Sequence, residues 1–79
     1  MSGDSRTAEF LSHYTKCQRQ IYVYVRSHIQ STADCDDVVQ NVGAVLWEKY
    51  GAYRPEESFT RWAFGIARLE VLKYRHKYP

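Results

Sequence analysis

The sequence predicts an all-α fold, a small three-helix bundle, and three observations support this prediction. Apolar residues recur at steps of three and four along three separate segments, which is the period of one helix face. Gly51, Pro55 and Ser58, which favour turns and helix ends, separate the second segment from the third. The 79 residues leave room for one core, and a chain that is 44% hydrophobic and 25% charged has the composition of a folded domain.

The first helix is predicted from about residue 8 to residue 30. Its apolar positions fall on one face: Phe10, Tyr14, Cys17, Ile21, Tyr24, Val25 and Ile29. A polar segment precedes it, so we expect a flexible lead over residues 1–7 and the helical domain over residues 8–79.

The second helix is predicted over about residues 35–50, with Thr32 or Asp34 as its N-cap and Gly51 as its C-terminal cap. Its apolar stripe consists of Val38, Val39, Val42, Leu46 and Tyr50. Pro55 bars a helix across the connector that follows, and Ser58 is the expected N-cap of a third helix over residues 59–77.

The charges divide into two neighbouring segments of opposite sign. Residues 33–50 hold four acidic residues and one basic residue, whereas residues 59–79 hold five basic residues and one acidic residue. Such a division suggests two different partners, but charge alone favours the simpler interpretation of two solvated helix faces.

Several function classes find no support in the sequence. The four glycines are scattered rather than gathered in a phosphate-binding loop, and no nucleophile has a convincing base, so we expect neither an enzyme nor a cofactor. His13 and Cys17 could contact one metal ion, but two ligands do not make a site. Without a secretory signal, Cys17 and Cys35 are expected to be reduced thiols in the core of a cytoplasmic protein. The sequence contains no apolar run of about 18 residues, so no membrane partner is expected.

Three stretches carry a resemblance to a known family. They are residues 34–50, with Asp-Cys-Asp-Asp-Val-Val-Gln-Asn-Val and Leu-Trp-Glu-Lys-Tyr; residues 53–59, with Tyr-Arg-Pro-Glu-Glu-Ser-Phe; and residues 59–68, with Phe-Thr-Arg-Trp-Ala-Phe-Gly-Ile-Ala-Arg. In this order and at this spacing they resemble region 2 of the extracytoplasmic-function sigma factors, which belong to the sigma-70 family. The resemblance extends over residues 8–77.

The resemblance implies two binding surfaces and no catalysis. In that family this region docks on the clamp helices of the RNA polymerase β′ subunit, captures the non-template strand of the −10 promoter element, and can be bound by an anti-sigma factor. By position, the polymerase-binding residues are Asp36, Asp37, Gln40, Asn41 and Trp47. The DNA-binding residues are Tyr53, Arg54, Ser58, Phe59, Arg61, Trp62, Arg68, Lys73, Arg75 and Lys77. The family usually has Glu where Asn41 stands and often Asn where Leu69 stands.

Physical chemistry agrees with the DNA assignment, because a base leaving the stack is held by aromatic stacking and by cations on the backbone. Trp62 and Phe59 also suit a helix core, and Trp47 could shield the first helix instead of contacting polymerase. Two other functions remain open: a stand-alone helical DNA-binding domain, and a protein-interaction module that works without polymerase.

Overall fold

The computed structural model describes the backbone of residues 2–79 and the side chains of residues 5–79, and over this range it contains helices and no strand. The elements are α1 (Ser2–His28), α2 (Thr32–Glu48), a single 3₁₀ turn η1 (Tyr50–Ala52) and α3 (Phe59–Lys77). The predicted all-α three-helix bundle is therefore confirmed.

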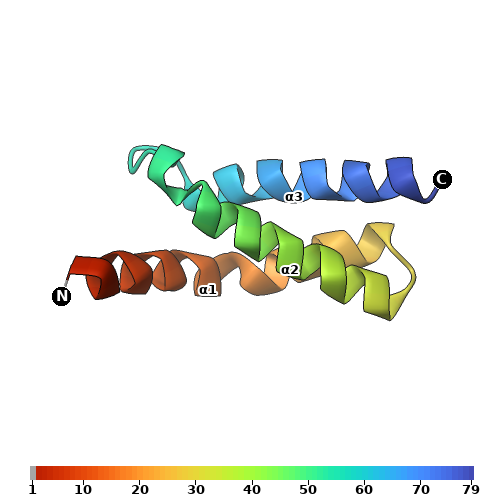
Figure 1. Cartoon of the computed structure of the whole chain (residues 1–79), viewed down its shortest axis with the longest axis horizontal. Coiled ribbons are helices and arrows are strands. Elements are labelled where there is room, and N and C mark those ends of the chain that lie inside the picture. The colour runs from red at the N-terminus through yellow and green to blue at the C-terminus, as the bar shows by residue number, and fades with distance from the viewer. Residues whose placement is uncertain (1) are drawn as a thin grey trace.

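The bundle is elongated, with extents of 43 × 21 × 19 Å. Helices α1 and α3 run in the same direction along the long axis, and α2 runs back obliquely, so that each helix packs on the other two (Figure 1). The first turn of α1 and the last turn of α3 lie at opposite ends of the molecule (Figure 1). None of the helices described is long and apolar enough to cross a membrane.

One core runs the length of the bundle and is built from the predicted apolar stripes. Its buried residues are Phe10, Cys17, Ile21, Val25, Ile29, Cys35, Val38, Val42, Leu46, Tyr50, Phe59, Ala63, Ile66, Ala67 and Val71. Both cysteines are free and buried, as predicted, and burial raises the pKa of each thiol above its ordinary value. They pack as small apolar residues.

Helix α1 begins earlier than predicted. Its backbone is helical from Ser2, whereas the sequence predicted a start near residue 8; Met1 lies outside the described residues. The reason is tertiary packing: the Arg6 guanidinium lies over the rings of Trp47 and Tyr50, at 5.8 and 5.6 Å from their centroids, and Glu9 accepts a hydrogen bond from the Tyr50 hydroxyl. The expected flexibility of residues 1–7 stays a prediction.

The predicted caps of α2 were wrong. Ser31 is the N-cap, and its hydroxyl accepts from the Asp34 amide at 3.2 Å, so the helix begins at Thr32. At the other end the helix stops at Glu48, and Gly51 lies inside η1 with no positive φ. After α2 the chain continues into a 3₁₀ turn, in which the Ala52 amide donates to the Lys49 carbonyl at 2.9 Å. Because this turn satisfies the carbonyl, no glycine in the left-handed conformation is needed to end the helix.

The predicted start of α3 was right. The Ser58 hydroxyl accepts from the Arg61 amide at 3.3 Å, and the helix runs from Phe59 to Lys77. Because this cap fixes the direction in which α3 leaves the connector, it also positions the residues considered next.

Candidate protein and nucleic-acid interfaces

The exposed side of α2 carries the residues predicted to bind polymerase. Asp36, Asp37, Gln40 and Asn41 are all exposed, while Val38 and Val42 on the opposite side of the helix are buried. The stripe of Val38 and Val42 ties the helix to the core, so the polar side chains are held outward on a rigid element. We call these four exposed residues the α2 surface.

Trp47 lies apart from the α2 surface, near the other end of the helix. Its ring meets the edge of Phe10 at 5.2 Å, stacks against Tyr50 at 6.3 Å and has the Arg6 guanidinium over it. The side chain is still 43% exposed. Trp47 therefore shields α1 with part of its ring and leaves the rest accessible.

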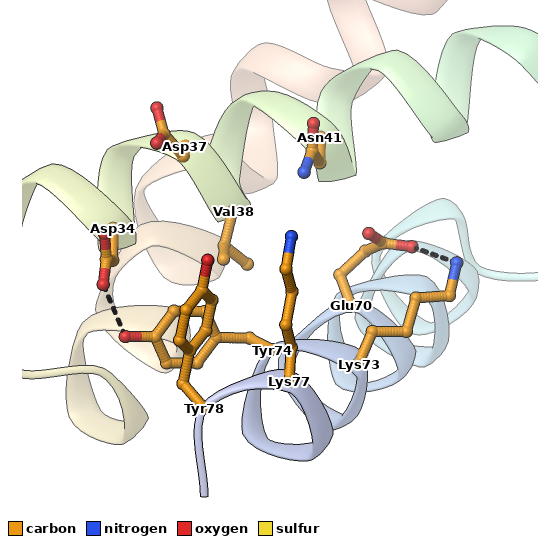
Figure 2. Close-up of a pocket in the computed structure, with 9 residues that line it drawn as sticks. All are labelled: Asp34, Asp37, Val38, Asn41, Glu70, Lys73, Tyr74, Lys77 and Tyr78. Carbon is orange, nitrogen blue, oxygen red and sulfur yellow. Dashed lines mark hydrogen bonds and ion pairs between the residues drawn. The ribbon is translucent and has the colours of Figure 1, made fainter.

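A groove of about 290 Å³ lies between the first half of α2 and the last turns of α3 (Figure 2). The Tyr74 hydroxyl crosses it and donates to the Asp34 carboxylate at 2.6 Å, and this hydrogen bond, with burial, raises the pKa of Tyr74. Lys73 pairs with Glu70 at 3.1 Å, and Figure 2 shows the Lys77 ammonium pointing toward α2. The full lining is Asp34, Asp37, Val38, Asn41, Glu70, Lys73, Tyr74, Lys77 and Tyr78.

The groove changes the expected grouping of the charged residues. Lys73 and Lys77 were predicted to follow the DNA backbone, yet they line the same groove as Asp37 and Asn41 of the α2 surface. Lys77 points toward α2 and lowers the negative potential of that surface, whereas the charge of Lys73 is paired with Glu70 of α3.

The connector between η1 and α3 is held by an aromatic cluster. The half-buried Tyr53 ring stacks on Tyr50 at 5.9 Å, lies 5.3 Å from both Phe59 and Trp62, and meets His13 at 5.7 Å. Its hydroxyl donates to the Glu57 carbonyl at 2.8 Å, which closes the loop over residues 54–57. Tyr53 thus anchors the connector on the core and leaves Arg54 exposed at the tip.

A second hollow, of about 540 Å³, opens where the connector meets α3. It is lined by Glu56, Glu57, Ser58, Arg61 and Trp62. Arg61 and Ser58 are exposed, and Trp62 is half-buried. The hollow brings together a guanidinium, a hydroxyl and part of an indole ring, which can hold a planar polar group. Glu56 and Glu57 also line it, and their negative charges disfavour binding of an anion beside them.

Phe59 is not at the surface. It is only 5% exposed, stacks on the His13 ring at 4.9 Å and packs against Phe10 and Trp62. In this conformation it offers no free face to a base. Phe59 is a core residue that fixes where Tyr53 and Trp62 stand, one of the two roles that the sequence left open.

Residues 13–78 match the protein-family model for Sigma-70 region 2. The chain belongs to the sigma-70 region 2 family. No curated protein matches it, and no solved structure does. Sigma factor domains act in transcription initiation, with the RNA polymerase core and promoter DNA as partners, and they are binding modules rather than enzymes.

In this sigma region 2 domain the remaining cations form a line along the outer side of α3. Arg61, Arg68 and Arg75 are exposed and stand seven residues apart, hence about 10.5 Å from one to the next along the helix axis. We call them the arginine stripe. Their spacing of seven is a signal in the sequence itself, because helical periodicity alone places these arginines on a different face from Lys73 and Lys77.

Proposed function

We propose that this sigma region 2 domain, of the extracytoplasmic-function type, binds the β′ clamp helices through its α2 surface and holds the unpaired non-template strand of the −10 element at its connector. The observation that carries the proposal is the separation of two chemically different surfaces on one rigid core. An acidic, amide-bearing helix face lies on α2, and a hollow with a guanidinium and an indole lies where the connector meets α3.

The polymerase-binding role rests on Asp36, Asp37, Gln40 and Asn41. All four are exposed on a helix, so a second helix can reach them without any change of fold. Trp47 contributes at the far end of α2, where part of its ring is accessible. Asn41 supplies hydrogen bonds where the family usually supplies a charge, which leaves Asp37 as the main partner for a basic clamp residue.

The DNA-binding role divides among residues with different tasks. Arg54, Ser58, Arg61 and Trp62 surround the place where a base can be held, and Tyr53 and Phe59 position them from the aromatic cluster. Arg68 and Arg75 continue the arginine stripe toward the rest of the strand, because phosphate contacts set the register of a bound nucleic acid. We assign Lys73 and Lys77 a smaller part in binding the DNA backbone, because they line the groove between α2 and α3.

Binding of the domain to an isolated β′ clamp-helix peptide tests the first role. Asp37→Arg and Gln40→Arg should each abolish retention, because each places a cation against a basic partner. Gln20→Arg, the same change at an exposed glutamine of α1, serves as the matched control and should bind like the wild type. Retention that survives both changes on α2 would refute the assignment of this surface.

Fluorescence anisotropy with single-stranded and duplex −10 DNA tests the second role. The proposal predicts tighter binding of the single strand and a roughly ten-fold loss for Arg54→Ala, since a hydrogen bond to a charged group contributes about 1.5 kcal/mol. Arg19→Ala, at an exposed arginine of α1, is the control. Equal affinity for duplex would favour a stand-alone DNA-binding domain, and no binding of either form at low salt would favour a protein-interaction module.

A further inference from the structure

His13 of α1 belongs to neither of the two proposed interfaces, although the sequence had singled it out as a possible metal ligand. The part of the chain that the structure describes contains no group of three or more His, Cys, Asp or Glu side chains that could hold a metal ion. The imidazole has a different setting, because its ring is half-buried among the aromatic residues that hold the connector. What it does there follows from the angles between the rings.

His13 covers one face of the Phe59 ring. The two rings are nearly parallel, with 13° between their planes and 4.9 Å between their centroids. Four other rings meet Phe59 at steep angles of 62–79°, and these belong to Phe10, Tyr50, Tyr53 and Trp62. Rings that meet Phe59 edge-on limit where it lies, whereas a ring stacked on it sets the plane in which it lies. The plane of Phe59 therefore depends on His13.

The same imidazole also contacts the other end of the loop. Its ring meets the Tyr53 ring at 5.7 Å and 67°, so His13 touches the residue before residues 54–58 and, through Phe59, the residue after them. The hydrogen bond from Tyr53 to the Glu57 carbonyl closes the loop on itself but does not attach it to α1. Figure 1 shows the first half of α1 and the connector at the same end of the bundle. One side chain of α1 thus holds both ends of the loop.

From these contacts we propose that His13 is a positioning residue for the binding of single-stranded DNA. By holding Tyr53 and Phe59, its ring keeps the connector and Trp62 in the arrangement that forms the hollow beside α3. His13 does not line that hollow, so it acts through the two rings that it touches. The inference rests on the proposed function, because the strand itself is held by residues of the connector and of α3.

Three variants of the 79-residue chain test the proposal by anisotropy with single-stranded −10 DNA, at a temperature where circular dichroism shows each of them folded. His13→Ala removes both ring contacts and should weaken binding about five-fold, the order expected for the loss of two aromatic contacts. His13→Phe keeps a planar ring and should bind like the wild type. Tyr24→Ala is the matched control and should also bind like the wild type. Tyr24 is a half-buried ring that packs on Phe64 of α3 at 5.6 Å, about 16 Å further along α1.

Digestion with a glutamate-specific protease gives a second measurement that needs no DNA. Glu56 and Glu57 are exposed in the connector, whereas Glu70 lies within α3. His13→Ala should be cleaved at least about three-fold faster after the two connector glutamates, with Glu70 as protected as in the wild type, because only the loop is loosened. Tyr24→Ala should keep the wild-type pattern of cleavage.

Either of two results overturns the proposal: unchanged cleavage of the connector in His13→Ala, or binding of DNA by His13→Phe that is as weak as that of His13→Ala. Unchanged DNA affinity in His13→Ala overturns it as well. A wild-type chain that binds single strands no better than duplex counts against the DNA role itself, and the cleavage rates then still decide whether His13 holds the connector. The two failures are therefore distinguishable.

Discussion

At the scale of single residues, two tyrosine hydroxyls join elements that are far apart in the sequence. Tyr50, after α2, donates to Glu9 of α1, and Tyr74 of α3 donates to Asp34 of α2. Hydrogen bonds to ionised carboxylates are stronger than those between neutral groups. The two bonds tie both ends of α2 to its neighbours, which is why the α2 surface is held in a fixed orientation.

The pH dependence of stability should report on Tyr50. Burial and the Glu9 carboxylate raise the pKa of Tyr50 to about 12 from the ordinary 10.0. The contribution of neutral Tyr50 to the free energy of unfolding is complete below pH 10 and is lost as the pH rises toward 12. The reason is that Tyr50 ionises at a lower pH in the unfolded chain than in the folded one. A tyrosinate absorbance titration should lose this late ionisation in Tyr50→Phe and show it earlier in Glu9→Gln. An unchanged titration in Glu9→Gln would contradict the assigned cause.

Two glycines inside helices should respond differently to alanine. Gly65→Ala meets open space and should raise the free energy of unfolding by about 0.5–1 kcal/mol, because glycine loses more backbone entropy in a helix. Gly43→Ala would put its Cβ 3.1 Å from the Tyr14 hydroxyl, so its gain should be smaller or negative. Urea unfolding followed by circular dichroism measures the free energy of unfolding of both variants. An equal increase in the two would mean that the Tyr14 ring moves aside without cost.

At the scale of elements, helix starts control where the functional side chains point. Ser31 and Ser58 are both N-caps with extended backbones, and each accepts from an amide three residues later. Ser31 sets the beginning of α2 and thereby the register of Asp36 and Asp37. Ser58 sets the beginning of α3 and the position of Arg61 beside the connector.

Removing either cap should cost about 1 kcal/mol of stability, as loss of a serine N-cap commonly does. Ser31→Ala and Ser58→Ala should shift the urea midpoint similarly, since both hydroxyls satisfy one free amide. Only Ser58→Ala should also weaken single-stranded DNA, because it loosens the connector. Ser12→Ala, at an exposed position within α1, is the control and should not lower stability. Loss of DNA binding in Ser31→Ala would argue against this separation of roles.

At the scale of the whole molecule, the distribution of charge matters more than the net charge of +2. The cations of α3 divide between two sides: the arginine stripe faces outward, and Lys73 and Lys77 line the groove with the acids of α2. The molecule therefore presents positive charge along one edge while its α2 surface is partly neutralised.

The salt dependence of DNA binding tests this distribution. For a single strand, the logarithm of the affinity falls with the logarithm of salt concentration by about 0.7 per neutralised phosphate. Arg75→Ala should reduce that slope by about this amount, and Lys77→Ala should reduce it less because its ammonium points toward α2 (Figure 2). Equal slopes for the two variants would mean that Lys77 leaves the groove when DNA binds.

Much of the fold followed from the apolar period alone. It predicted the three helices, the stripes that fill the core and the buried cysteines, and a turn residue predicted the Ser58 cap. The reason is that burial of one face of a helix leaves an apolar repeat of three and four residues in the sequence. The helix ends were less predictable: Ser31 capped α2 instead of Thr32 or Asp34, and α1 extended to Ser2 through contacts of Arg6 and Glu9 with distant aromatic rings.

The sequence by itself determined the fold class, the exposure of the α2 residues and the motifs that place the chain in the sigma-70 region 2 family. Only the tertiary structure decided that Phe59 is core, that Lys73 and Lys77 line a groove beside α2, and that Leu69 and Leu72 remain exposed. The physical reason is that helical periodicity says which residues share a face. Which neighbour covers that face depends on how the three helices cross.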